Sequence, residues 1–138
     1  MEIRHAKMND CESIVILDSQ IIDSRIREHL IKSSIEENRC LVCEINKRIV
    51  GFLIYHKFFF GHLFIDLIIV SLEMRRLGIA KNLMKYVEFY SERKLFSSTN
   101  KSNIKMQKVF QSLGYIKSGF IDHLDEGDPE IIYVKLLD

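Results

Sequence analysis

The sequence has little of the residues that mark the less common classes of protein. Among its 138 residues there is no Trp, one Pro and three Cys. Apolar residues make up 47% and charged residues 28%, which excludes the composition of a disordered or collagen-like chain. We therefore expect a globular protein that folds unaided as one domain over residues 1–138, because this length leaves no room for a second module.

The three cysteines do not form the pattern of a metal site or a disulfide framework. Their number is odd, and the pair Cys40 and Cys43 has no second cluster that would complete a zinc site. Both lie in an expected strand, where a separation of three points them to opposite faces. We expect structural thiols and no bound metal.

Neither sign of charge dominates, and no apolar run is long. Lys and Arg total 20 against 19 Asp and Glu, so no overall field favours nucleic acid or an anionic membrane. The most apolar stretch, residues 63–70, contains Asp66 and is much shorter than the roughly 20 residues of a membrane helix. The start of the chain carries Glu2 and lacks the apolar run of a signal peptide, so we expect a cytoplasmic protein with no membrane partner.

Hydrophobic periodicity predicts an alternation of strands and helices. Apolar residues recur at helical spacing in some segments and at strand spacing in others, separated by polar turns and glycines. The expected strands are residues 1–6, 41–45, 49–60, 62–70, 94–99, 115–122 and 131–137, and the expected helices are 11–21, 23–37, 78–93 and 103–113. This order predicts an α/β fold with a mixed central sheet of about seven strands and four helices on both faces.

The segment from Val70 to Ala80 contains the clearest functional pattern. A buried strand there leads through a short basic loop into an amphipathic helix. The first N–H groups of a helix have no partner within it and lie at the positive end of the helix dipole, so they suit a pyrophosphate. Arg75, Arg76 and Lys81 add cations, and Gly78 leaves room beside the backbone. The alternative is a solvated basic turn before a helix.

The pattern Arg75-x-x-Gly78-x-Ala80 after a strand resembles the coenzyme A loop of the GNAT superfamily of N-acetyltransferases. A second stretch, from Asn103 to Gly114 and Tyr115, is similar to the other family motif. The resemblance covers nearly the whole chain and implies a single GNAT-like domain with a splayed fourth and fifth strand. It also implies acetyl-CoA as co-substrate, held by Ile68, Ile69, Val70, Arg75, Arg76, Leu77, Gly78, Ile79, Ala80, Lys81, Asn103 and Phe110.

The catalytic groups depart from the family pattern at two positions. Phe110 stands where many members have the Tyr that protonates the departing thiolate, and Ser98 stands where some have a catalytic Glu. Ser98 belongs to a polar run that either orients substrate in a cleft or forms an exposed strand end. Asp66 interrupts an apolar strand, so it is either a base for the amine or a carboxylate with a structural partner.

The resemblance implies direct transfer of acetyl from acetyl-CoA to a primary amine, without a covalent enzyme intermediate. The amine is open among peptide N-termini, lysine, polyamines and small molecules, and the acyl group need not be acetyl. The acidic loop of Asp125, Glu126, Asp128 and Glu130 either attracts a cationic amine or is turn chemistry. Among the histidines, His62 and His123 are the candidates for lining a cleft.

The residues leave two other functions open beside this enzyme, and they also leave the assembly state open. Phe110 and Ser98 favour a non-catalytic acyl-CoA-binding domain, whereas the basic loop alone would suit a small nucleic-acid or protein-interaction module. Near-neutral charge disfavours that module, and we expect no nucleic-acid partner. A homodimer is possible, since exposed strand edges often pair between subunits.

Overall fold

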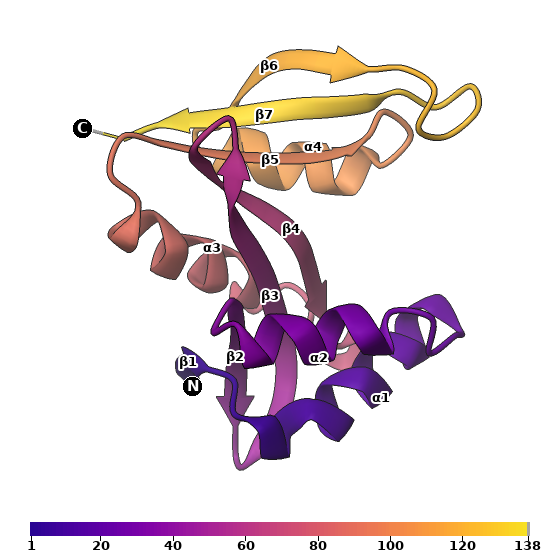
Figure 1. Ribbon diagram of the computed structural model, residues 1–138, viewed down its shortest axis with the longest axis vertical. Helices are drawn as coiled ribbons and strands as arrows, with labels where there is room; N and C mark the ends of the chain where they lie inside the picture. The colour runs from indigo at the N-terminus through magenta and orange to yellow at the C-terminus, as the bar shows by residue number, and fades with distance from the viewer. Residues whose placement is uncertain (138) are drawn as a thin grey trace. The chain divides into compact units, whose positions relative to one another are not determined.

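The computed structural model describes residues 1–137, whose strands form one seven-stranded sheet in the order β1-β2-β3-β4-β5-β7-β6 (Figure 1). The mixed α/β sheet and its four α-helices confirm the predicted fold class. The strands are β1 (Glu2–His5), β2 (Cys40–Ile45), β3 (Arg48–Phe59), β4 (His62–Val70), β5 (Lys94–Asn100), β6 (Ile116–Ile121) and β7 (Glu130–Leu136). The helices are α1 (Cys11–Ile22), α2 (Glu28–Glu36), α3 (Ile79–Tyr90) and α4 (Ile104–Ser112), with short 3-10 turns η1 (Met8–Asp10) and η2 (Leu72–Met74).

The chain divides into two compact units, and β3 and β4 each pass from one to the other. The first unit holds Met1–Tyr55 and Leu67–Phe89, and the second holds His56–Asp66 and the chain from Tyr90. The expectation of one domain over residues 1–138 stays a prediction.

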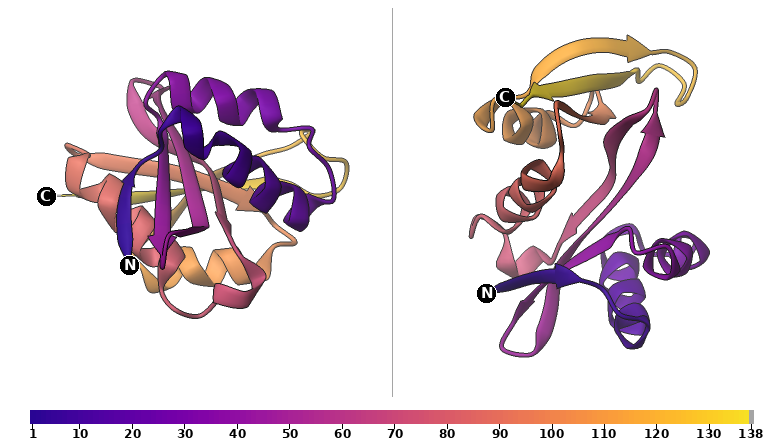
Figure 2. Two further views of the ribbon diagram at one scale, coloured as in Figure 1. Left: turned by 90° about the horizontal axis from the view of Figure 1, so that it is seen from below. Right: turned by 60° about the vertical axis from the view of Figure 1, so that its left-hand side comes forward.

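In the first unit, helices cover both faces of the strands. Figure 2 (right) shows α1 and α2 on one side of these strands and α3 on the other. Alternate residues of β2 and β3 face α1 and α2, as the period of two in a strand requires. The core on that face contains Ile14, Val15, Leu17, Ile31, Ile35, Cys40, Val42, Phe52 and Ile54.

On the opposite face, α3 packs closely against Gly51 of β3. A Cβ added at Gly51 would lie 2.9 Å from Ile79 Cγ2 and 3.5 Å from Leu83 Cδ1. The first distance is shorter than real contacts allow, so any larger residue would push the start of α3 away from the strand. Glycine at position 51 thus fixes how closely the first turn of α3 approaches β3.

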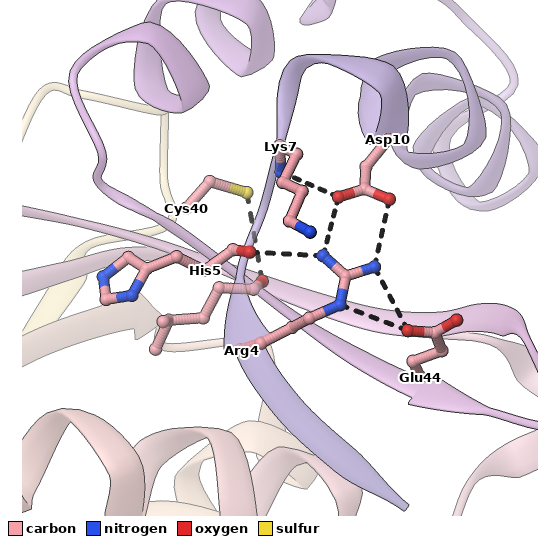
Figure 3. A network of polar contacts seen from close by, with 7 residues as sticks. Arg4, His5, Lys7, Asp10, Cys40 and Glu44 are labelled. Atoms are coloured by element: carbon pink, nitrogen blue, oxygen red, sulfur yellow. Dashed lines mark hydrogen bonds and ion pairs between the residues drawn. The ribbon is translucent and has the colours of Figure 1, made fainter.

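The guanidinium of Arg4 joins β1 to β2 and to the beginning of α1 (Figure 3). It donates two hydrogen bonds to Asp10, at 2.8 and 3.1 Å, and one from Nε to Glu44 at 3.1 Å. The Lys7 backbone N–H also donates to Asp10, at 2.7 Å. The hydrogen bonds from Arg4 are the largest influence on the Asp10 carboxyl and lower its pKa.

The second helix is shorter than the periodicity predicts. We expected a helix from residue 23, but Asp23 has a left-handed backbone (φ 57°) that ends α1, and α2 begins at Glu28. Between them, Arg27 donates two hydrogen bonds to the buried Asp18 of α1, at 2.7 and 3.1 Å. This ion pair ties the intervening turn to α1 and starts the second helix later.

The second unit is built on β5 and β7, with α4 packed on one face. β5 pairs antiparallel with β7 from Lys94–Leu136 to Asn100–Glu130, and parallel with β4 from Leu63–Leu95 to Ile65–Ser97. Phe110 of α4 is fully buried, and its ring stacks on that of Tyr133 in β7, with centroids 4.6 Å apart. This aromatic contact fixes α4 on the strands.

Candidate coenzyme and acetyl-transfer site

The loop between β4 and α3 contains two residues with a left-handed backbone. After η2, Arg75 is extended, and both Arg76 (φ 68°) and Gly78 (φ 77°) are left-handed. The left-handed region favours glycine, and a Cβ added at Gly78 would meet no atom within 4 Å. The space beside Gly78 is therefore open to a ligand.

The start of α3 presents backbone donors to this open side. The first hydrogen bond of the helix runs from the Asn82 N–H to the Gly78 carbonyl, at 2.9 Å. The N–H groups that precede Asn82 have no acceptor within the helix, because the chain there has not completed a turn. Together with the helix dipole they suit an anionic phosphate.

The cations of this loop have no carboxylate partner among the residues that the structure describes. Arg75, Arg76 and Lys81 are exposed, and none makes a hydrogen bond or ion pair from its side chain within residues 1–137. By contrast, Arg4, Arg25, Arg27 and Arg39 each pair with a carboxylate. The open backbone and these available charges fit the pyrophosphate of a coenzyme A molecule.

The remaining predicted coenzyme residues of the first unit are placed mostly by packing. Ile79 is buried, Ala80 is half-buried and Leu77 is exposed. Ile68, Ile69 and Val70 at the end of β4 are half-buried, and Ile69 packs on the core beneath α1 and α2. Any role of these three in binding would therefore rest on their main-chain groups.

In the second unit, the carboxylate of Asp66 is exposed and has no polar partner in the described chain. A structural role for this carboxylate therefore finds no partner among the described residues. The interruption of an apolar strand suggested a buried carboxylate, but Asp66 is exposed. Its role as a base stays a prediction.

Ser98 on β5 contacts a carboxylate that the sequence alone did not connect with it. Its hydroxyl donates a hydrogen bond to Glu130 Oε2 at 2.6 Å, across the antiparallel pair of β5 and β7. A carboxylate therefore lies beside the position where the family resemblance led us to look for a Glu. The signal was present in the sequence only as an acidic residue at the start of the last strand.

Asn103 and Phe110 both have structural roles within α4. The Asn103 side chain caps the helix by accepting a hydrogen bond from the Met106 N–H at 3.1 Å. The Phe110 ring is fully buried between helix and strand. Their contacts with coenzyme A stay predictions.

The acidic loop before β7 is held by hydrogen bonds of its own. Asp128 accepts from the backbone N–H and the hydroxyl of Ser102, at 3.0 and 2.6 Å, and Asp125 accepts from the Asn100 amide at 2.9 Å. These contacts support the interpretation of the loop as turn chemistry.

Two other kinds of site are absent from the described residues. No group of three or more His, Cys, Asp or Glu side chains in residues 1–137 is arranged to hold a metal ion. No helix in that part of the chain is long and apolar enough to cross a membrane.

The model of the acetyltransferase (GNAT) family matches residues 8–115 of the sequence. This match spans both units and includes the loop between β4 and α3. The chain belongs to the GNAT family of acetyltransferases. Membership confirms the prediction of an acetyltransferase enzyme.

Solved structures of GNAT proteins share its fold. A GNAT-family acetyltransferase from Bacillus cereus ATCC 10987 is 44% identical, with a TM-score of 0.94 over 99% of this chain and 97% of that one. An N-acetyltransferase from Staphylococcus aureus Mu50 is 20% identical, with a TM-score of 0.79 over 99% and 98%. The structure of yncA from Salmonella typhimurium with its cofactor acetyl-CoA is 15% identical, with a TM-score of 0.82 over 100% and 94%. Among curated proteins, no sequence matches this GNAT enzyme significantly.

Proposed function

We propose that this GNAT enzyme transfers the acetyl group of acetyl-CoA to a primary amine, which attacks the thioester directly. The observation that carries the proposal is the loop between β4 and α3, where Gly78 leaves open space beside the start of a helix. Three cations lie within three residues of Gly78 in the sequence, and none of them has a carboxylate partner in residues 1–137. Acetyl-CoA would supply an activated acetyl thioester.

The coenzyme would be held mainly by main-chain groups and cations. The N–H groups at the start of α3, with Arg75, Arg76 and Lys81, would bind the pyrophosphate. Main-chain groups of Ile68, Ile69 and Val70 would pair with the pantetheine arm and polarise the thioester carbonyl. The amide of Asn103 is available as a donor to the coenzyme, because its oxygen is the atom that caps α4.

The amine must lose a proton before or during attack, and Asp66 is our candidate to accept it. Its carboxylate is exposed and has no partner in the described residues, so it is accessible to an ammonium ion or to a bridging water. Ser98 would orient the substrate through the hydroxyl that holds Glu130. A cationic acceptor would be favoured by these carboxylates.

Transfer to a panel of amines tests the activity. Purified protein with acetyl-CoA should release free thiol faster in the presence of one class among peptides, lysine, polyamines and small amines. Acetylated product identified by mass should appear in equal amount. A folded protein that binds acetyl-CoA but acetylates none of these would contradict the proposed reaction.

Changing Asp66 to Asn tests the proposed base. We expect Asp66→Asn to lower kcat at neutral pH by about tenfold or more, since general bases contribute about 10²–10⁴-fold. The loss should be largest where the amine is mostly protonated, and affinity for acetyl-CoA should stay nearly intact. Glu2→Gln, which neutralises an exposed carboxylate on β1, is the control. Equal kcat in both variants would remove Asp66 from the mechanism.

A further inference from the structure

In the second unit, the face of the sheet opposite α4 keeps part of its surface exposed. Along β5, buried side chains alternate with half-buried ones. Ser97 belongs to the buried set and pairs with Tyr133, whose ring stacks on a phenylalanine of α4, so this set faces the helix. The half-buried set, Phe96, Ser98 and Asn100, therefore points to the other face.

Three phenylalanine rings lie together on this half-buried face and form an aromatic cluster. Phe64 of β4 stands beside Phe96 of β5 in the parallel ladder. The Phe59 ring of β3 contacts both, with centroids 4.8 Å from Phe64 and 5.0 Å from Phe96. Phe64 is buried, whereas Phe59 and Phe96 are half-buried. The cluster therefore presents partly exposed rings at the separations that aromatic pairs prefer, and a further ring can pack on them.

Charged groups lie at both ends of the aromatic cluster and differ in sign. Asp66 on β4 and Ser98 on β5 follow the cluster by two residues, so they share its face and lie at the same end. Ser98 brings the carboxylate of Glu130 to that end. Lys94 precedes the cluster by two residues and lies at the other end. A cation on this face is therefore favoured beside the carboxylates and disfavoured beside Lys94.

We propose that the acceptor is a primary amine with an aromatic ring two carbons from its nitrogen. The ring packs on the aromatic cluster, and the ammonium group lies at the end that holds Asp66. This inference rests on the proposed acetyl transfer. A strand rises about 3.3 Å per residue, so residues two apart on one face are separated by about 6.6 Å, which a two-carbon linker and ring span. A polyamine would instead bring a second cation toward Lys94.

Steady-state acetylation of paired amines tests this substrate class. The kcat/KM for 2-phenylethylamine should exceed that for n-butylamine at least about tenfold, mostly through KM, because burial of the ring adds binding energy. A peptide with N-terminal phenylalanine contains the same arrangement and is compared with the peptide that begins with glycine. A preference in only one pair shows whether the ring belongs to a free amine or to a chain end. Equal kcat/KM within both pairs would overturn this inference alone, whereas acetylation of no amine would contradict the proposed function.

Replacing a ring of the aromatic cluster should remove the preference. Phe96→Ala should lower kcat/KM for the aromatic amine about tenfold, and an unchanged value for n-butylamine would show that the variant is folded. Phe59→Ala should act in the same direction and serves as the second variant. Phe120→Ala is the matched control, because Phe120 of β6 is 64% exposed and pairs with Ile131, on the α4 face of the sheet. A preference that survives in both cluster variants, or is lost equally in Phe120→Ala, would overturn the inference.

Discussion

Arg4 and Arg75 belong to the same compact unit but are used in opposite ways. Arg4 is partly buried, at 23% side-chain exposure, and its guanidinium pairs with the carboxylates of Asp10 and Glu44. Arg75 is exposed beside an open glycine and has no such partner among residues 1–137. An arginine whose charge is satisfied inside the protein contributes to folding, whereas one without a carboxylate is available to an anionic ligand. The comparison predicts separable effects on stability and on coenzyme affinity.

The largest expected effect is on acetyl-CoA affinity and comes from filling the open space beside Gly78. Gly78→Glu places a carboxylate beside the proposed pyrophosphate and should reduce acetyl-CoA affinity more than about 100-fold, measured by calorimetry. A side chain at this left-handed position also costs about 1 kcal/mol of stability. Circular dichroism should show that the variant remains folded.

Gly61→Glu is the matched control for this change. Gly61 also has a positive φ, of 81°, and a Cβ added there would meet no atom within 4 Å. The control thus introduces the same charge and a similar backbone strain at the turn between β3 and β4. Equal affinity losses in the two variants would contradict the assignment of the phosphate loop.

Exchanging each arginine for alanine should separate the two roles. Arg75→Ala should weaken acetyl-CoA binding about threefold to tenfold and leave the free energy of unfolding unchanged. Arg4→Ala should do the reverse and lower that free energy by about 2 kcal/mol, because two carboxylates lose charged hydrogen bonds. Calorimetry and urea unfolding of both variants measure the two quantities. A loss of binding in Arg4→Ala at unchanged stability would break the comparison.

Acid titration should give the smallest effect, and it acts on the partly buried pair of Arg4 and Asp10. Arg4 lowers the pKa of Asp10 in the folded state, so this ion pair stabilises the protein above the ordinary Asp pKa, near 3.9. That contribution is lost as the pH falls through the lowered value. The difference in unfolding free energy between wild type and Asp10→Asn should therefore be constant above about pH 5 and shrink below pH 4. A difference that does not change with pH would show that the Asp10 charge contributes nothing.

Local sequence patterns were sufficient to predict most of the elements, because strand and helix periods are properties of neighbouring residues. Strand β4 and helix α3, for example, have nearly the predicted bounds, and Gly78 in the loop between them leaves open space, as its lack of a side chain indicated. The late start of α2 was missed because it depends on the pairing of Arg27 with Asp18, a tertiary contact.

The second unit contains what periodicity could not predict. The contact of Ser98 with Glu130, and the stack of Phe110 on Tyr133, both depend on the register of β7 against β5 and on the packing of α4. Register is set by pairing across long sequence separations, which a single sequence does not specify. The sequence therefore identified two departures from the family pattern but not the groups that lie beside them.

Calorimetric titration of the purified enzyme with acetyl-CoA and with coenzyme A tests the central claim most directly. We predict saturable, micromolar binding of both, weakened by salt because cations hold the pyrophosphate. A folded protein that binds neither molecule would contradict the assignment of the loop from Arg75 to Lys81 as a coenzyme site.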